Sequence, residues 1–429
     1  MLKLILKNLW ARRRRNGWLL AELILVTVLT WYITDPVLVL TYNRSLPLGY
    51  NPEGLVIVSL CNLPSTASGY SEKEADSLHV MQNVDRLLRE LRRHPDVQSA
   101  APLLTYTYPG SGGSYSTSLS YDTLTSSSAI YFFIPRSGYF ETFGFDVLEG
   151  KTLQDLDRMD FQQEEVVITD DMTQRLAEEN SLTGKQIYNK NSEDTTFYRV
   201  RAMVTKTRSR TFEQGMPSCF QPQLEVDIED VIGDGKLLMR LKPGVSEQRF
   251  LHEFRLWAQS HLRAGNLYVR DAQTYHEQLK KLEYGYGVTN KYRMNVALAF
   301  FFLVNLALGV TGTFWLQTRS RRGEVGIMLS YGASPGQISR LLMGEAAILA
   351  SFAWLVGCLI YLQYGIAEGN WYQQGGYIKA DYWINNFWLH YAAVSFIVYV
   401  IILFVVLLGV YIPARKISRV SPTEALRDE

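Results

Sequence analysis

The sequence predicts a membrane α-helical protein with four transmembrane helices and a large α+β domain inserted between the first and second spans. Two observations lead to this fold class. Four apolar stretches each approach or exceed the ~20 residues that a helix needs to cross ~30 Å of hydrocarbon. Clusters of arginine and lysine flank these stretches on one side only. The apolar stretches are Trp18–Leu40, Met294–Leu316, Leu341–Tyr364 and Trp388–Ile412.

The basic clusters indicate the orientation of the chain. Basic residues in short flanking segments remain on the cytoplasmic side of the membrane. The short loop expected outside, Gly365–Asn386, carries a single cation, Lys379. Both termini are therefore predicted to be cytoplasmic, with an even number of crossings. The clusters are Lys3, Lys7 and Arg12–Arg15; Arg319, Arg321, Arg322 and Arg340; and Arg415, Lys416 and Arg419.

This topology places residues from about Tyr42 to Lys291 outside the cytoplasm, as one insert. The polar insert explains a mean hydropathy of −0.06, which resembles that of a soluble protein although four spans are present. The net charge of +1 does not indicate nucleic-acid binding, because the membrane rule accounts for the basic residues.

The N-terminal segment resembles a secretory signal, because Arg12–Arg15 precede an apolar run. No small-residue cleavage site follows, so we interpret the run as an uncleaved anchor. Ahead of it, Leu2, Ile5, Leu6 and Leu9 recur at i, i+3, i+4 and i+7. This spacing predicts an amphipathic helix lying along the inner membrane interface.

Polar residues inside the spans are few. Glu22 and Glu345 lie near cytoplasmic ends, and Asp35 precedes a proline near the outer end of the first span, where the helix is expected to bend or stop. A proton relay needs several groups at mid-depth, and only Asn295 and Asn305 come close to that position. We favour end positions and interhelical hydrogen bonds over a relay.

The inserted domain shows a weak internal repeat. Two strand–helix–strand units flank a less regular middle, which predicts an α+β lobe with a second lobe between its halves. The first unit comprises a strand at Leu55–Leu60, a helix over about Ser71–Arg93 and a strand at Val97–Leu104; the second comprises a strand at Lys236–Leu241, a helix starting at Ser246 and a strand at Leu267–Val269.

The middle lobe is harder to assign. Thr105–Ser128 is rich in Ser, Thr, Tyr and Gly, which fits either a mobile loop or short polar strands. Further on, Glu165–Ile168 and Tyr198–Val204 are predicted strands, Asp170–Glu178 a helix, and Arg208–Gln223 a loop.

Three parts of the chain carry a family resemblance. The first is Tyr139–Gly150 with the later Val166–Thr169 and Leu182–Lys185, the second is Arg319–Ser334, and the third is Pro413–Arg427. In this order, and in a four-span chain, they resemble the FtsX-like, MacB-type permeases of bacterial ABC transporters (type VII, mechanotransmission). The resemblance covers essentially the full length. Tyr198–Val204 departs from it, since the usual glycine-valine-valine run is missing.

The resemblance implies a non-catalytic permease subunit of the bacterial inner membrane. It has no cofactor of its own, because a cytoplasmic ATPase dimer binds the ATP. A second permease chain, identical or different, completes the membrane part, and a periplasmic adaptor or substrate protein is a possible further partner. The implied activity is efflux or release of a peptide, lipoprotein or toxic compound. The alternative is an FtsX-type signalling module that senses a peptide or activates a periplasmic cell-wall hydrolase.

Domain limits follow from the spans and the resemblance. They are an amphipathic helix at 1–16, spans at 17–41, 292–317, 341–364 and 387–412, a MacB-like periplasmic core domain at 42–291 with units near 54–104 and 236–270 around an inserted lobe near 105–235, a cytoplasmic coupling loop at 318–340, a periplasmic loop at 365–386, and a cytoplasmic tail at 413–429.

The segment between the second and third spans is the predicted ATPase contact. Val325, Ile327, Met328 and Tyr331 form a docking face, and glycines permit close approach or a sharp turn. The charged residues can pair with a partner or with lipid headgroups. The alternative is an ordinary positive-inside loop, which the resemblance disfavours. The predicted coupling residues are Arg321, Arg322, Glu324, Val325, Gly326, Ile327, Gly332 and Ala333.

Catalytic motifs are absent from the sequence. No G-x-x-x-x-G-K-[ST] loop occurs, since Gly184-Lys185 is followed by Gln186, and no G-x-S-x-G nucleophile motif is present. The six histidines show no metal-ligand spacing. A membrane-anchored enzyme is therefore disfavoured. Cys61 and Cys219 would lie in an oxidising compartment, where a disulfide is permitted, but the sequence does not decide the pairing.

Overall fold

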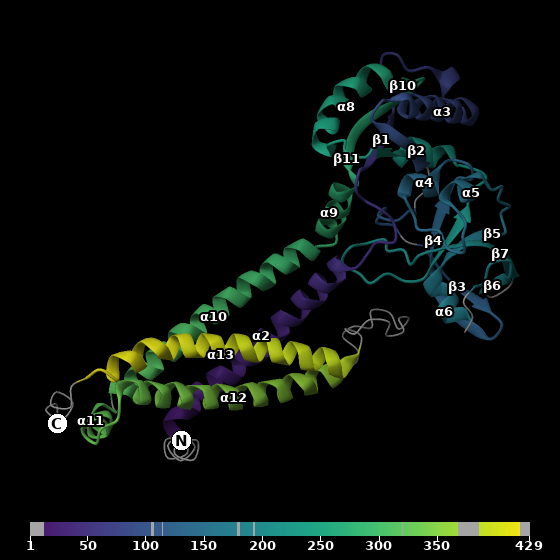
Figure 1. Cartoon of the computed structure of the whole chain (residues 1–429). Helices are drawn as coiled ribbons and strands as arrows, with labels where there is room; N and C mark the ends of the chain where they lie inside the picture. The colour runs from purple at the N-terminus through teal and green to yellow at the C-terminus, as the bar shows by residue number, and fades with distance from the viewer. Residues whose placement is uncertain are drawn as a thin grey trace. The chain divides into compact units, whose positions relative to one another are not determined.

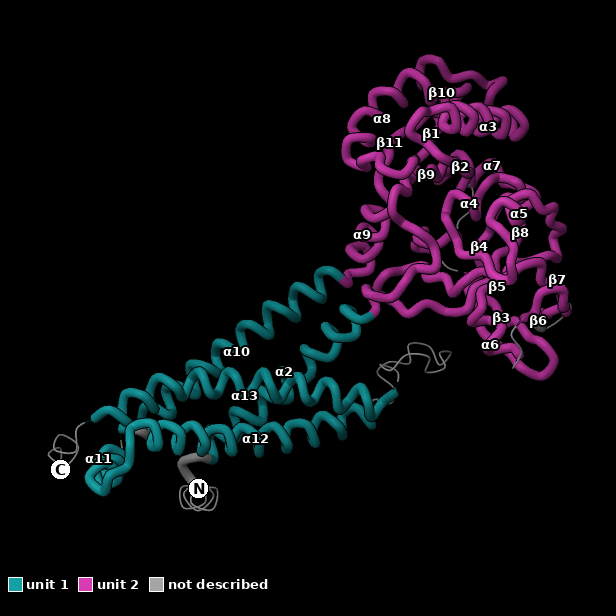
Figure 2. Tube along the Cα trace, viewed as in Figure 1, with its two compact units in different colours: residues 1–42, 289–429 teal, residues 43–288 magenta. Residues whose placement is uncertain are grey.

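The computed structural model describes residues 13–103, 107–113, 115–177, 181–191, 194–319, 321–367 and 386–420. The chain divides into two compact units, which Figure 2 shows in different colours: unit 1 is Met1–Tyr42 with Thr289–Glu429, and unit 2 is Asn43–Val288. Most of the predicted N-terminal amphipathic helix, residues 368–385 of the predicted 365–386 loop, and the tail from residue 421 on lie outside the described residues. Residues 365–367 of that predicted loop belong to the last turn of α12.

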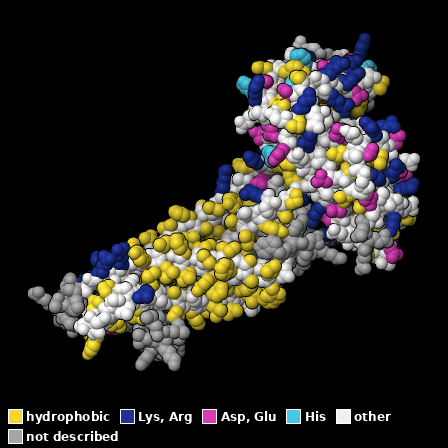
Figure 3. Space-filling model, viewed as in Figure 1, with side chains coloured by type: hydrophobic (Ala, Val, Ile, Leu, Met, Phe, Trp, Pro, Cys, Tyr) yellow, Lys and Arg dark blue, Asp and Glu magenta, His cyan; other side chains and the backbone are white. Residues whose placement is uncertain are grey.

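Unit 1 is helical (Figure 1). Its helices are α2 (Arg13–Ser45), α10 (Val288–Arg319), α11 (Arg322–Ser330), α12 (Pro335–Ala367) and α13 (Phe387–Ile417). Four of them are long and apolar enough to cross a membrane: Gly17–Ser45, Val288–Gln317, Pro335–Ile366 and Phe387–Ile417. Figure 3 shows hydrophobic side chains covering the visible face of these helices, with lysine and arginine gathered at the end near α11. The predicted four-span fold class is confirmed.

The first span continues past its proline. α2 runs through Pro36 to Ser45, so of the two outcomes expected at Asp35-Pro36, a bend or a stop, the stop does not occur. Membrane helices tolerate proline because neighbouring helices and side-chain hydroxyls compensate the backbone groups that it frees. Ending the helix inside the membrane would also leave backbone N–H and C=O groups without hydrogen-bond partners in lipid, which is costly.

Three of the spans pack closely together. α12 and α13 bury apolar residues at intervals of about one turn, among them Ala346, Ala350 and Ala353 on α12 and Val398 and Ile402 on α13. Small residues let membrane helices approach. α10 is different, since only 11% of its apolar window is buried, against 39–44% for the other three spans.

Unit 2 contains a five-stranded antiparallel sheet in the order β10-β11-β1-β9-β2. The sheet follows the β-α-β-β-α-β pattern of ferredoxin-like folds, which explains the internal repeat. Helices α3 and α8 carry the apolar faces that pack against it. The elements are β1 (Leu55–Asn62), α3 (Ser77–Arg93), β2 (Val97–Leu103), α7 (Ile228–Asp234), β9 (Lys236–Leu241), α8 (Glu247–His261), β10 (Arg263–Ala264) and β11 (Leu267–Thr274).

A closed barrel is inserted between β2 and β9, in the order β3-β4-β8-β5-β7-β6. Closure leaves no unpaired sheet edge. Its strands are β3 (Tyr115–Tyr121), β4 (Leu124–Phe133), β5 (Glu165–Thr169), β6 (Gln186–Asn191), β7 (Asp194–Val204) and β8 (Ser218–Pro222). The remaining helices of unit 2 are the 3₁₀ turn η1 (Glu72–Glu74), α4 (Tyr139–Phe143), α5 (Leu153–Arg158), α6 (Asp170–Leu176) and α9 (Tyr275–Gly285).

A buried arginine joins the sheet to the elements around the barrel. The Arg240 guanidinium, on β9, donates hydrogen bonds to the carbonyls of Asn51, Glu53, Thr142 and Phe143 at 2.8–2.9 Å. Burial lowers the pKa of Arg240. Four carbonyl acceptors compensate the desolvated charge, so this side chain fixes β9 against the end of α4.

The structure corrects two local predictions and decides a third. Helix α3, predicted to start near Ser71, begins at Ser77. Asp76 caps it by accepting a hydrogen bond from the His79 backbone N–H at 3.0 Å. The predicted loop Arg208–Gln223 contains strand β8, whose partners β4 and β5 are remote in sequence. Of the two alternatives for Thr105–Ser128, polar strands are correct for the part covered by β3 and the start of β4.

Candidate functional site

The predicted coupling segment forms the short helix α11 and the turn into α12. Arg321, just before α11, is 6% exposed. Its two terminal nitrogens lie 2.5 and 3.0 Å from the carboxylate oxygens of Glu345 on α12. Its Nε lies 3.5 Å from Glu324. Arg321 therefore has carboxylate partners within the chain, and its buried bidentate pair anchors the start of α11 to the third span.

The α11–α12 turn is closed by caps at both ends. Gly332 has φ +91°, a left-handed conformation that favours glycine. Its N–H bonds to the Leu329 carbonyl, and the Ala333 N–H bonds to the Met328 carbonyl at 3.0 Å, which is the Schellman pattern. Ser334 and Gln337 then exchange hydrogen bonds at the start of α12 as a capping box. The turn is thus defined by its own hydrogen bonds.

The predicted docking residues fall on two faces of α11. Val325 and Gly326 are buried, and Val325 belongs to the core of unit 1. Ile327 is 50% exposed and Tyr331 is 89% exposed. Glu324 is also exposed. Glu324, Ile327 and Tyr331 stand at i, i+3 and i+7, so they form one outward face with a charge beside two large apolar side chains. Arg322 is half-buried.

A second polar cluster lies where α2, α12 and α13 meet. His390 Nε2 on α13 lies 2.6 Å from Asp35 Oδ1 on α2, and both side chains are buried. One turn before Asp35, Trp31 donates from Nε1 to Ser395 Oγ at 3.1 Å. The Trp31 ring stacks on Tyr361 of α12 with centroids 3.9 Å apart. These contacts connect three spans.

The sequence does not predict this cluster. Asp35 beside Pro36 indicates a helix bend or end, and the spacing of His390 indicates only that it is not a metal ligand. The available signal was that one acid and one histidine lie near the outer ends of two predicted spans, where an ionisable residue requires a partner. Interhelical hydrogen bonds, favoured from sequence, are present: Thr311 of α10 donates to the Gly409 carbonyl of α13 at 3.1 Å.

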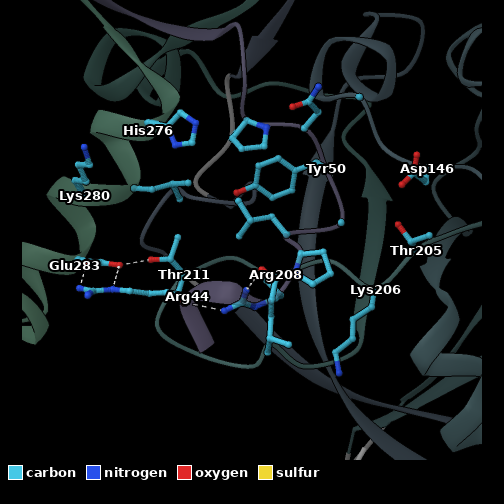
Figure 4. Close-up of a pocket in the computed structure, with 18 of the residues that line it drawn as sticks. Arg44, Tyr50, Asp146, Thr205, Lys206, Arg208, Thr211, His276, Lys280 and Glu283 are labelled. Atoms are coloured by element: carbon cyan, nitrogen blue, oxygen red, sulfur yellow. Dashed lines mark hydrogen bonds and ion pairs between the residues drawn. The ribbon is translucent and has the colours of Figure 1, made fainter. Parts of the chain in front are cut away.

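A pocket of about 1030 Å³ lies in unit 2 at the residues that follow α2 and along α9. Figure 4 shows Arg44 and Thr211 both directed at Glu283. The Arg44 guanidinium lies 2.6 Å from the Glu283 carboxylate, and the Thr211 hydroxyl donates to the same carboxylate at 2.6 Å. These bonds tie the last turn of α2 to α9.

Buried Arg208 strengthens this junction. Its guanidinium donates to the backbone carbonyls of Leu46, Thr211 and Glu213. The segment after β7 is therefore held against the residues that leave α2. The Arg44, Arg208 and Thr211 side chains at this end of the pocket therefore bond to Glu283 or to backbone carbonyls.

Within the described ranges, no group of three or more His, Cys, Asp or Glu side chains is arranged to hold a metal ion. The three cysteines Cys61, Cys219 and Cys358 are free, so the disulfide left open by the sequence is not formed. Burial raises the pKa of the Cys219 thiol to about 12, which keeps it protonated and unreactive.

Comparison with known families gives two matches. Residues 56–255 match the MacB-like periplasmic core domain, and residues 296–422 match the FtsX-like permease C-terminal region. Together they cover the larger part of the chain. Among curated proteins, no relative matches.

Solved structures also show similarity. The periplasmic region of MacB from Actinobacillus actinomycetemcomitans is 14% identical, with a TM-score of 0.30, and the match covers 55% of this chain and 94% of that one. A domain of a putative permease protein from Porphyromonas gingivalis is 13% identical, with a TM-score of 0.32 and coverage of 52% and 92%. The extracellular domain of the noncanonic ABC-type transporter YknZ from Gram-positive bacteria is 14% identical, with a TM-score of 0.28 and coverage of 50% and 100%.

Proposed function

Since the chain belongs to the FtsX-like permease family and carries its MacB-like periplasmic core domain, we propose that it couples ATP hydrolysis by a separate subunit to movement of that domain. Members of this family are in general non-catalytic components of ABC transporters that work with an ATPase. The chain would act in efflux or release of a substrate such as a peptide, lipoprotein or toxic compound.

The four apolar helices and the periplasmic core domain fit a protein of the bacterial inner membrane. In the proposed orientation both termini and α11 are cytoplasmic and unit 2 is periplasmic. The positive-inside rule supports this, because the basic clusters flank the spans on the α11 side. A second permease chain and a cytoplasmic ATPase dimer complete the proposed assembly, which contains no cofactor bound by this chain.

The observation that carries the ATPase contact is the exposed face of α11. A tyrosine that is 89% exposed and an isoleucine that is 50% exposed stand on a helix whose other side is buried. Large apolar side chains gathered on a polar surface are typical of protein interfaces. We assign the docking face to Glu324, Ile327 and Tyr331, with Arg322 at its edge.

The remaining predicted coupling residues would support that face without contacting the ATPase. Arg321 holds α11 to α12 through Glu345. Val325 and Gly326 pack into the bundle, and Gly332 and Ala333 close the turn. A force on α11 would therefore pass to α12 through a buried ion pair and a capped turn, neither of which bends easily.

The test is ATPase coupling in the reconstituted complex. Tyr331→Ala should lower stimulation of the ATPase by this chain at least about tenfold, because buried interface tyrosines commonly contribute 2 kcal/mol or more. Tyr331→Phe is the matched control, since it keeps the ring and should retain most of the stimulation. Full coupling in Tyr331→Ala together with Ile327→Ala would refute the assignment of the face.

A further inference from the structure

A second hollow in unit 2 is lined by residues of the barrel and of α7, none of which lines the first pocket. Its volume is about 500 Å³, within the range of ~300–1,000 Å³ typical of ligand pockets. Five segments meet there: the first residue of β3, the end of β4, Gln163 before β5, the end of β8 with the residues after it, and α7. We call this the acidic groove and define it by Tyr115, Phe132, Leu224, Glu225 and Asp230.

The floor of the acidic groove is apolar and open to water. Tyr115 and Leu224 are each 54% exposed, and the Tyr115 and Phe132 rings meet edge to face with centroids 6.3 Å apart. By contrast, Phe133 and Phe220 on neighbouring strands of the barrel are buried. Exposed apolar surface of this kind gains about 25 cal/mol for each Å² that a ligand covers.

The rim of the acidic groove is negatively charged. Residues 223–235 contain five acidic side chains and no lysine or arginine. Asp234 pairs with Lys236 at 2.5 Å. Within the described part of the chain, Glu225 and Asp230 form no ion pair.

Helix capping accounts for only part of this charge. Asp227 caps α7 by accepting from the Glu229 N–H at 3.0 Å, and acids in the first turn of a helix offset its dipole. Glu225 precedes the cap and gains nothing from it. Leu224 beside it is exposed and does not belong to the core of the barrel.

From the apolar floor and the unpaired carboxylates we propose that the acidic groove binds a cationic peptide segment. An aromatic or aliphatic side chain of the peptide packs on Tyr115, Phe132 and Leu224. Lysine or arginine on either side pairs with Glu225 and Asp230, and a cation over an aromatic face adds a favourable contact. This goes beyond the proposed ATPase coupling and does not depend on it, because binding is a property of this chain alone.

The experiment uses the full-length chain in uncharged maltoside micelles and two labelled peptides of equal length. The probes are acetyl-Lys-Trp-Lys-Leu-Lys-amide and acetyl-Glu-Trp-Glu-Leu-Glu-amide, followed by fluorescence anisotropy. The cationic probe should bind at least about tenfold more tightly, and its affinity should fall as salt is raised, because exposed ion pairs are screened.

Substitutions locate the site. Leu224→Ser should weaken binding of the cationic probe at least about tenfold through lost apolar contact. Glu225→Gln and Asp230→Asn should each weaken it up to about fivefold, as expected for an exposed ion pair. Glu229→Gln is the matched control: it removes the same charge from the same helix outside the groove, and should change affinity less than twofold.

Three outcomes of the binding experiment overturn the proposal, and a fourth comes from the oligomeric state. The three are equal binding of the two probes, unchanged affinity in both Leu224→Ser and Glu225→Gln, and an equal loss in Glu229→Gln. Concentration-dependent self-association that Leu224→Ser abolishes would assign the groove to a second copy of this chain and would also overturn it. All the substituted side chains are at least partly exposed, and circular dichroism together with gel filtration verifies that each variant is folded.

Discussion

Two buried contacts between ionisable side chains connect helices among the described residues of unit 1, and they do so in different ways. Arg321 and Glu345 are close in sequence and join α11 to α12 through two parallel hydrogen bonds. Asp35 and His390 come from the first and last spans and share one contact of 2.6 Å. A guanidinium is always charged, whereas an imidazole can become neutral and keep its hydrogen bond. The first pair is thus a bidentate pair with a permanent cation, and the second is a single hydrogen bond that an imidazole makes in either of its forms.

This difference predicts how the stability of the bundle responds when one partner of each pair is removed. Removing Arg321 takes two charge-assisted hydrogen bonds from a carboxylate that stays buried. Changing Asp35 alters a single hydrogen bond, because an imidazole ring nitrogen can also bond a neutral partner. We therefore expect the two ends of the bundle to respond unequally to the removal of one partner.

The largest effect is expected for Arg321→Met. It leaves the Glu345 carboxylate buried without its cation, which typically costs about 3–5 kcal/mol. The midpoint of thermal unfolding in micelles, followed by tryptophan fluorescence, should fall strongly. The double variant Arg321→Met/Glu345→Met should recover most of the loss, because well-packed apolar residues often replace a buried pair without penalty. A double variant as unstable as the single one would show that the pair is not the cause.

A smaller effect is expected for Asp35→Asn. The asparagine amide can still hydrogen-bond the His390 ring, so one hydrogen bond is weakened and not removed, and the expected loss is about 1–2 kcal/mol. The same unfolding measurement compares it with Arg321→Met. Equal losses in the two variants would contradict the distinction between the bidentate charge pair and the single hydrogen bond.

A third variant tests the hydrogen bond that Trp31 donates one turn before Asp35. Trp31→Phe removes the bond from Nε1 to Ser395 Oγ but keeps a ring to stack on Tyr361. The expected loss is about 1 kcal/mol, that of one hydrogen bond with some ring contact retained. Trp354→Phe is a suitable control, since that indole donates to the Ser395 backbone carbonyl at 2.9 Å. A drop as large as that of Arg321→Met would mean that Trp31, and not Asp35, is the main tie between spans.

The sequence was sufficient for elements whose signal is local. The spans follow from runs of apolar residues, and the ferredoxin-like half of unit 2 follows from two strand–helix–strand patterns that each lie within about fifty residues. Capping signals were also present, since Ser334 and Gln337 have the spacing of a capping box and Pro335 stands at the first helical position.

The elements and contacts that the sequence does not predict depend on partners remote in the chain. Five-residue β8 is a strand because β4 and β5 lie on either side of it. The Asp35–His390 contact joins residues 355 positions apart. Side-chain type indicates that such groups need partners, but only the packed bundle determines which partner is in reach. For the same reason the sequence predicts a partner or lipid headgroups for Arg321 but does not predict its buried pair with Glu345.

Asp157 in unit 2 extends the comparison to a carboxylate with no cationic partner among its hydrogen bonds. It accepts the backbone N–H groups of Phe140 and Glu141 at 3.2 and 2.7 Å, at the start of α4. Burial outweighs these bonds and raises the pKa of Asp157 from 3.8 to about 6.

This raised pKa gives the smallest predicted effect. A carboxyl group that binds its proton more tightly when folded adds stability below its unfolded pKa, and that contribution is lost as pH rises through about 6. Acidification from pH 7 to pH 5 should therefore raise the unfolding midpoint of the wild-type chain relative to Asp157→Asn, which keeps a side-chain acceptor but cannot titrate. The contradicting outcome is a difference between the two midpoints that is the same at both pH values. Burial would then not set the pKa of Asp157. The two backbone N–H donors would be enough to hold its carboxylate ionised without any cation.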